Sequence, residues 1–191
     1  MPFAVVSSRL NNVFGLPAMV EVARYSALEA LADGRRIEIR ALRRDDQAGL
    51  LAAINRTSAE SLYRRFFGAK RDFSEKERDF FLNIDFVNHV ALVAVVNEAN
   101  HPVIVAGGRY VVERPGAAEV AFAVIDEYQG QGIGAVLLRH LTIIARDAGL
   151  EQFTAEVLPD NVSMLKVFEK SGLKIDKKRE AMAVHVTLQL F

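Results

Sequence analysis

The sequence of 191 residues contains no cysteine. This absence excludes disulfide bonds, thiolate metal sites and a cysteine nucleophile, so no reaction can pass through a cysteine acyl-enzyme. It also fits a reducing compartment, and we expect a cytoplasmic protein.

Net charge and long apolar runs are lacking as well. The 24 Lys and Arg residues balance the 24 Asp and Glu residues, so net charge alone attracts neither nucleic acid nor an anionic membrane. No stretch approaches the roughly 20 apolar residues that span a bilayer. The N-terminus interrupts its apolar run at Arg9 and Asn11, unlike a signal peptide. We therefore expect neither nucleic acid nor a membrane as a partner.

Metal and serine-hydrolase signals are also absent. The four histidines lack metal-ligand spacing, and no G-x-S-x-G elbow is present, so we predict no metal site and no serine nucleophile. What is present is an ordinary globular composition, with 51% hydrophobic and 25% charged residues. The length predicts a single domain over residues 26–191, preceded by an N-terminal arm over residues 1–25 whose pattern is weak.

Hydrophobic periodicity and turn signals predict alternating strands and helices. Asp33-Gly34 favours a hairpin that ends in a strand over 36–42, with a helix over 18–32 as the alternative. Ser74 and Glu77 form a capping box. The other elements are expected as a helix from Asp45 or Asp46 to about Asn55, helices 58–67 and 74–84, strands 89–96, 102–113 (interrupted by Gly107-Gly108) and 118–125, helix 132–148, strand 151–157, helix 161–171, and strands 173–178 and 182–190. This order predicts a mixed α/β sheet with few parallel crossovers.

The stretch from Val124 to Gly134 carries the most information about chemistry. A strand ends, polar residues turn the chain, and three alternating glycines open an amphipathic helix. Glycines let the backbone approach a ligand closely, and the free N–H groups of a first helical turn attract anions. The pattern predicts a site for a pyrophosphate.

Three other interpretations of this loop fit less well. A Walker loop needs Lys and then Ser or Thr after its last glycine, whereas Ala135 and Val136 follow here. A dinucleotide fingerprint normally follows the first strand of a large parallel sheet, and this loop lies two-thirds along the chain. A plain glycine-rich turn would lose much backbone entropy on folding without binding anything.

The residues resemble those of one known family. Gln129-x-x-Gly132-x-Gly134 is similar to the Q/R-x-x-G-x-G/A signature of the GNAT superfamily of acyl-CoA-dependent N-acyltransferases. The segment from Asn161 to Leu173 resembles the family's N-x-x-x-x-x-x-Y/F-E-K-x-G-F/L ending, and residues 36–178 follow its order of elements. Ser58–Phe67 and Ala118–Val124 look like the bacterial protein-lysine acetyltransferase subgroup.

This resemblance implies an α/β (α+β) fold with a mixed, mostly antiparallel central sheet of six to seven strands flanked by helices. It implies acetyl-CoA as the acyl donor and no metal. The backbone of Val124 and Ile125 would pair with the pantetheine arm, and an N–H near residues 123–125 would face the thioester oxygen. Asn161 would contact the arm or act as a plain N-cap. The pyrophosphate would be held by the backbone of Gln129, Gly130, Gln131, Gly132, Ile133 and Gly134.

Glu119 is the candidate general base. In an alternating strand it shares a face with Ala121 and Ala123, whose small side chains leave room for a substrate, and water would relay the proton. The related subgroup has a glutamate at the matching position; an ordinary surface glutamate is the alternative. Phe168 stands where many family members have a tyrosine acid, and it has no proton to donate.

The acceptor is an amine, and a protein lysine is favoured by the subgroup resemblance. The segment Ser58–Phe67, with Tyr63 and Arg64 as its substrate-binding residues, would form one wall of the acceptor site. The basic and aromatic run at 64–67 is otherwise typical of a nucleic-acid patch, which zero net charge disfavours. Two other functions stay open: an acetyltransferase for a small-molecule amine, and an acyl-CoA sensor that binds without turnover. A homodimer is compatible with the sequence.

Overall fold

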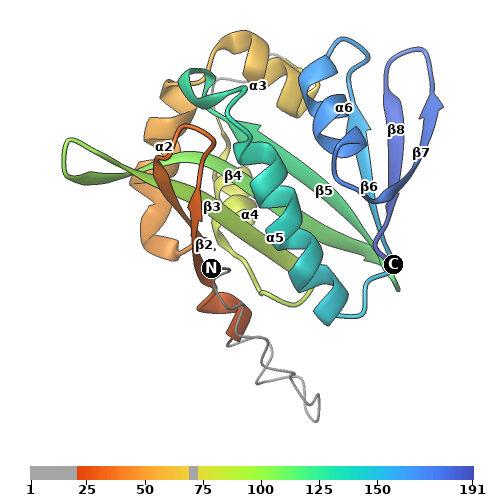
Figure 1. Ribbon diagram of the computed structural model, residues 1–191, viewed down its shortest axis with the longest axis horizontal. Helices are drawn as coiled ribbons and strands as arrows, with labels where there is room; N and C mark the ends of the chain where they lie inside the picture. Colours follow the sequence, from red (N-terminus) through yellow and green to blue (C-terminus); the bar gives the residue numbers. More distant parts are fainter. Residues whose placement is uncertain (1–20, 69–72) are drawn as a thin grey trace.

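The computed structural model describes residues 21–68 and 73–191 (Figure 1). Residues 1–20 of the predicted N-terminal arm lie outside the described residues. The elements are β1 (Ser26–Ala30), β2 (Arg36–Ala41), η1 (Arg44–Asp46), α2 (Gln47–Asn55), α3 (Ala59–Phe66), α4 (Glu75–Leu82), β3 (His89–Glu98), β4 (His101–Arg114), β5 (Ala117–Val124), η2 (Asp126–Tyr128), α5 (Ile133–Asp147), β6 (Gln152–Val157), α6 (Val162–Glu169), β7 (Lys174–Arg179) and β8 (Val184–Gln189).

All these strands form one sheet of eight, in the order β1-β2-β3-β4-β5-β6-β8-β7. Every neighbouring pair is antiparallel except β5 and β6, which run parallel. The mixed, mostly antiparallel sheet is therefore confirmed, with one strand more than the upper expected number. Strand β1 is a short edge strand that pairs with β2 in the predicted hairpin.

The local turn signals act as expected. Asp33-Gly34 closes the β1–β2 hairpin, with Gly34 at φ 85°, so residues 26–30 are strand and the helical alternative is wrong there. Ser74 and Glu77 make both hydrogen bonds of the capping box that opens α4. Asp46 occupies the N-cap position of α2 but does not cap it. Its carboxylate instead accepts two hydrogen bonds of 2.7 Å from Arg40.

Strand β4 is continuous, so the predicted interruption at Gly107-Gly108 is wrong. Gly108 has a packing role: a Cβ at this position would lie 2.9 Å from the Phe122 ring and 3.2 Å from Leu141. The glycine therefore lets the aromatic ring of β5 and helix α5 pack closely over β4 without breaking the strand.

Helices cover both faces of the sheet. Helix α5 crosses one face (Figure 1), and its side chains at Leu137 and Leu141 are fully buried in the main core. It ends before Gly149, which has φ 78°. On the other face, Leu50 and Ala53 of α2 pack against a cluster formed by β3 and by Ile104 of β4. No helix in the described ranges is long and apolar enough to cross a bilayer.

The two parallel strands separate soon after they meet. β5 pairs with β6 only from Ala117–Gln152 to Glu119–Thr154, whereas β6 pairs with β8 along its whole length. Beyond Glu119 the rest of β5 therefore has β4 on one side and a gap on the other. This gap opens toward the loop that precedes α5.

Candidate active site

The backbone of β5 presents polar groups to the gap. Ile125 differs from the sequence expectation, because its N–H donates to Val105 O at 3.0 Å and its carbonyl accepts from Tyr128 N at 3.0 Å. Successive residues of a strand direct their backbone groups to opposite sides. The N–H of Val124 therefore faces the gap, and its carbonyl accepts from Gln129 Nε2 at 3.1 Å. The free backbone donor lies at Val124 rather than at Ile125.

The glycine loop forms a row of free donors. Gly130 and Gly132 have φ 73° and 86°, a conformation that favours glycine. Val136 N is the first amide of α5 with a backbone acceptor, the carbonyl of Gly132 at 3.1 Å. Within the described part of the chain, the N–H groups of residues 130–135 have no protein acceptor. Together with the positive end of the α5 dipole they suit a pyrophosphate.

The side chains of this loop hold it in place. Gln129 Nε2 donates to Ser61 Oγ at 3.0 Å, and Gln131 bonds Arg35 of the β1–β2 hairpin. Asp126 accepts hydrogen bonds from the hydroxyls of Ser58 at 2.9 Å and Ser61 at 2.7 Å, at the start of α3. These contacts explain the two glutamines, because their side chains position the backbone rather than point at a ligand.

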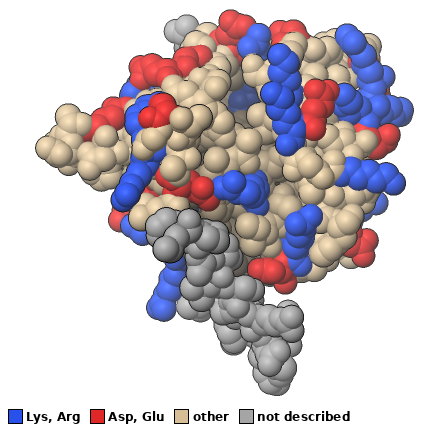
Figure 2. Space-filling view, viewed as in Figure 1, with Lys and Arg blue, Asp and Glu red and all other residues tan. Residues whose placement is uncertain are grey.

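Helix α6 borders the same gap. Asn161 is its N-cap, since its side-chain oxygen accepts from Met164 N at 3.2 Å. This bond uses only the oxygen, so the side-chain NH₂ is left to contact a ligand. Lys166 and Lys170 of this helix line the cavity described next. Figure 2 shows Lys and Arg side chains gathered on this side of the molecule, over α6 and the last strands.

A cavity of about 750 Å³ connects the gap, the glycine loop and the face of the sheet opposite α5. Its described walls come from α2, α3, α4, β3, β4, β5, η2, the start of α5, β6 and α6. The charged residues along it are mostly basic: Arg64, Arg65, Arg78, Arg109, Lys166 and Lys170, against Glu119 and Glu156. The positive excess suits ligands that carry several negative charges.

Glu119 lies in this cavity where β5 and β6 separate. Its carboxylate makes no hydrogen bond to any described residue, and it is exposed. Although the residue is exposed overall, the cavity walls partly desolvate its carboxylate and raise its pKa, as do the carboxylates of Glu113 and Glu156, whereas Arg65 lowers it. The raised pKa suits a group that accepts a proton.

The expected acceptor wall is only partly formed by the predicted residues. Arg64 lines the cavity and pairs with Glu60 at 2.6 Å, whereas Tyr63 is 46% exposed and does not line it. On a helix, neighbouring residues point about 100° apart, so one of the two faces solvent. Phe168 is buried and meets Phe122 edge to face, 6.2 Å between ring centroids.

Comparison with known proteins decides the family. Residues 52–173 match the family model described as "Acetyltransferase (GNAT) family". The chain belongs to the GNAT acetyltransferases. It is 35% identical to "Acetyltransferase PA5475" of Pseudomonas aeruginosa over 146 residues, and this matched region covers 76% of this chain and 78% of that protein.

Two further relatives place this GNAT acetyltransferase near one group. It is 37% identical over 117 residues to "Acetyltransferase Pat" of Mycolicibacterium smegmatis, covering 60% of this chain and 34% of that longer protein. The crystal structure of the GNAT domain of S. lividans PAT superposes with a TM-score of 0.79 at 33% identity, covering 86% of this chain and 96% of that one. The chain is thus an acetyltransferase related to Pat proteins.

Several cavity residues of this GNAT acetyltransferase were not predicted from the sequence. They include Arg109 of β4 and, on α4, Arg78 and Phe81; Arg65 lies within the Ser58–Phe67 segment that was expected to form the acceptor wall. The signal was weak: Arg109 is the one charged residue within the apolar stretch of β4, directly after the two glycines. The described residues contain no cluster of three or more potential metal ligands.

Proposed function

We propose that this enzyme transfers the acetyl group of acetyl-CoA to the amine of a protein lysine in the cytoplasm, by direct attack in a ternary complex. The observation that carries the proposal is the continuity of three features in one cavity. These are the free amides of residues 130–135, the gap beside β5, and the unpaired carboxylate of Glu119.

The chain's own groups account for binding of the donor. The amides of the glycine loop hold the pyrophosphate. Lys166 and Lys170 complement the negative charge of the donor's phosphates that the loop amides do not bind. The open side of β5 pairs with the amides of the pantetheine arm, as an added strand would. The N–H of Val124 faces the gap and is the candidate donor to the thioester oxygen as negative charge develops on it.

Glu119 supplies the base. A lysine amine is protonated at neutral pH and must lose a proton before its nitrogen can attack the carbonyl carbon. Glu119 takes that proton through water, the new C–N bond forms, and the C–S bond breaks to release CoA thiolate. Phe168 cannot protonate this thiolate, so water does.

Support for a lysine acceptor comes from the resemblance to the Pat relatives. The matched region covers about a third of the longer M. smegmatis protein. A small-molecule amine would use the same groups. A sensor that binds acyl-CoA without turnover is favoured by one observation, the absence of a proton-donating side chain at Phe168.

One experiment separates these functions. Calorimetry with acetyl-CoA is combined with thiol release over lysine peptides, peptides with a free N-terminal amine, and polyamines. We expect binding, and turnover that is highest with lysine peptides. Glu119→Gln should keep acetyl-CoA affinity and lose about 10²- to 10⁴-fold in rate at pH 7, with partial recovery at higher pH as free amine becomes abundant. Tight binding without turnover on any amine would establish the sensor instead, and an unchanged rate in the variant would exclude Glu119 as the base.

A further inference from the structure

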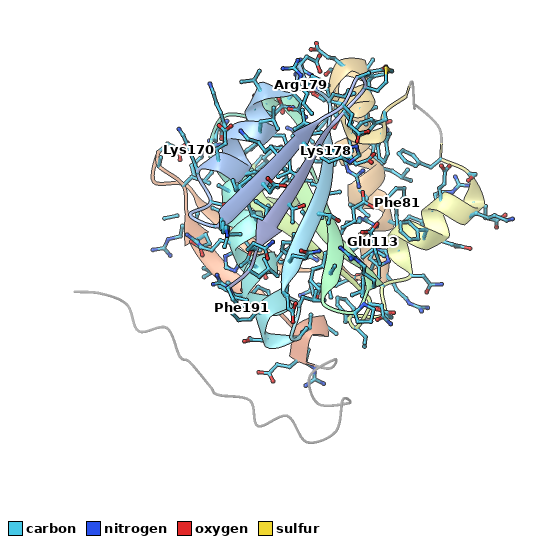
Figure 3. All side chains as sticks on the ribbon, turned by 90° about the vertical axis from the view of Figure 1, so that its right-hand side faces the viewer. Phe81, Glu113, Lys170, Lys178, Arg179 and Phe191 are labelled. Carbon is cyan, nitrogen blue, oxygen red and sulfur yellow. The ribbon has the colours of Figure 1, made fainter. Side chains whose placement is uncertain are left out.

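Arg109 projects into the acceptor side of the cavity from the middle of the sheet. It pairs with Ala121 across β4 and β5, on the same face as Glu119 and opposite α5. Its guanidinium lies 4.4 Å from the Phe81 ring centroid and 5.9 Å from that of Phe80. Phe81 and Glu113 mark this side of the sheet in Figure 3.

The one polar partner of Arg109 in the described chain is His89, whose Nε2 lies 3.1 Å from the guanidinium. Because arginine only donates, Nε2 must be the acceptor and the ring must be neutral. Burial and the charge of Arg109 agree with this, since they lower the pKa of His89 to about 4. His89 therefore orients Arg109 without neutralising its charge.

Arg65 brings a second guanidinium from α3. It stacks over the Phe66 ring at 4.9 Å and lines the same cavity. It is near enough to Arg109 to lower the pKa of that guanidinium, which burial and Arg65 together bring to about 9. Among the described residues no carboxylate forms an ion pair with either arginine; Glu119 acts on Arg65 only through its longer-range field.

Two cations held close together without a counter-ion are costly in a partly desolvated site. The guanidinium fork matches a carboxylate in two-point hydrogen bonding. The phosphates of the donor do not fill this role. Arg109 lies beside Ala121, about 10 Å of extended strand before Val124, and the glycine loop begins only after β5 has ended at Val124. The missing anion must enter from the acceptor side.

We propose that Arg65 and Arg109 bind a carboxylate of the acceptor next to its reacting amine, so that the enzyme selects lysines with an acidic neighbour. This inference rests on the proposed function and assigns its substrate class. The carboxylate comes either from a flanking Asp or Glu side chain or from the α-carboxylate of a small lysine derivative.

The test compares matched acceptors. Lysine peptides carrying Glu or its neutral isostere Gln at each of the two positions on either side of the lysine are assayed for kcat/KM. Nα-acetyl-lysine and its amide are assayed beside them. We expect the best Glu peptide to exceed its Gln counterpart by about 10- to 100-fold. A preference confined to the free α-carboxylate would assign the site to small acceptors.

Variants tie the preference to the two arginines. Arg65→Gln and Arg109→Gln should reduce kcat/KM for the Glu peptide by a larger factor than for the Gln peptide, so that the ratio of the two values approaches one. Arg114→Gln removes an exposed arginine of the same strand that does not line the cavity, and should leave the preference intact. If Arg109→Gln does not fold, Arg65→Glu, on the helix, should instead favour peptides with Arg beside the lysine.

The outcomes separate this inference from the proposed function. Equal kcat/KM for Glu and Gln peptides in the wild type, or equal losses on both in the variants, would overturn the inference and leave acetyl transfer intact. Without transfer to any peptide, the proposed function fails. Fluorescence anisotropy of the labelled peptides on the CoA-bound protein would then decide the inference, with equal affinities overturning it.

Discussion

Gly132 offers a quantitative test of the pyrophosphate site. It has φ 86° and ψ 0°, and a Cβ built there would meet no atom within 4 Å. Gly132→Ala therefore introduces no clash, and only the left-handed backbone disfavours it, by about 1–2 kcal/mol of folding free energy. Gly132→Glu adds a negative charge beside the free amides of the loop.

The size of the charge effect follows from Coulomb's law. A carboxylate about 5 Å from one phosphate charge is repelled by about 1 kcal/mol in water-like surroundings and about 3 kcal/mol at an effective dielectric of about 20. Gly132→Glu should therefore weaken CoA binding by about 5- to 200-fold relative to Gly132→Ala. Because alanine and glutamate at this position experience the same backbone strain, comparing the two variants isolates the effect of the charge.

The assay is calorimetry with CoA and with S-acetyl-pantetheine, which lacks the diphosphate, on variants whose thermal unfolding shows that they are folded. The two variants should bind S-acetyl-pantetheine equally and differ only with CoA. If Gly132→Glu is folded and binds CoA as tightly as Gly132→Ala, the loop does not hold the pyrophosphate.

Three further predictions concern the cavity. Glu113→Gln removes a charge that raises the pKa of Glu119, so the acidic limb of the kcat/KM profile should move to lower pH; an unmoved limb would argue against Glu119 as the titrating base. The pKa of His89 is about 4 in the folded protein, against an ordinary value of 6.5. The unfolded state therefore binds a proton that the folded state does not, and the free energy of unfolding falls by up to about 3 kcal/mol as pH falls from 6.5 toward 4. Urea unfolding should show that slope in the wild type, and His89→Gln should flatten it. Arg64→Ala should raise the acceptor KM about tenfold, from the loss of one charged contact, and leave CoA affinity nearly unchanged, while Tyr63→Ala, outside the cavity, should change neither; equal effects of the two would contradict the geometry.

Local chemistry explains which parts of the fold could be predicted. Asp33-Gly34 and the Ser74–Glu77 capping box each act through a few neighbouring residues, and the structure contains both. Asp46 shows the limit of this reasoning. Its type suits a cap for α2, but its carboxylate instead accepts hydrogen bonds from the guanidinium of Arg40 in β2 and from the amide of Arg43.

The sequence by itself determined the glycine loop, the helix that follows it and the family, because backbone conformation and amide direction depend on residues adjacent in the chain. Only the tertiary structure decided where β5 leaves β6, that Val124 rather than Ile125 keeps its amide free, and that Arg65 and Arg109 line the same cavity as Glu119. These features depend on strand register and helix packing between segments tens of residues apart. No local pattern determines such contacts, because they stabilise the protein only once the sheet has brought these distant segments together.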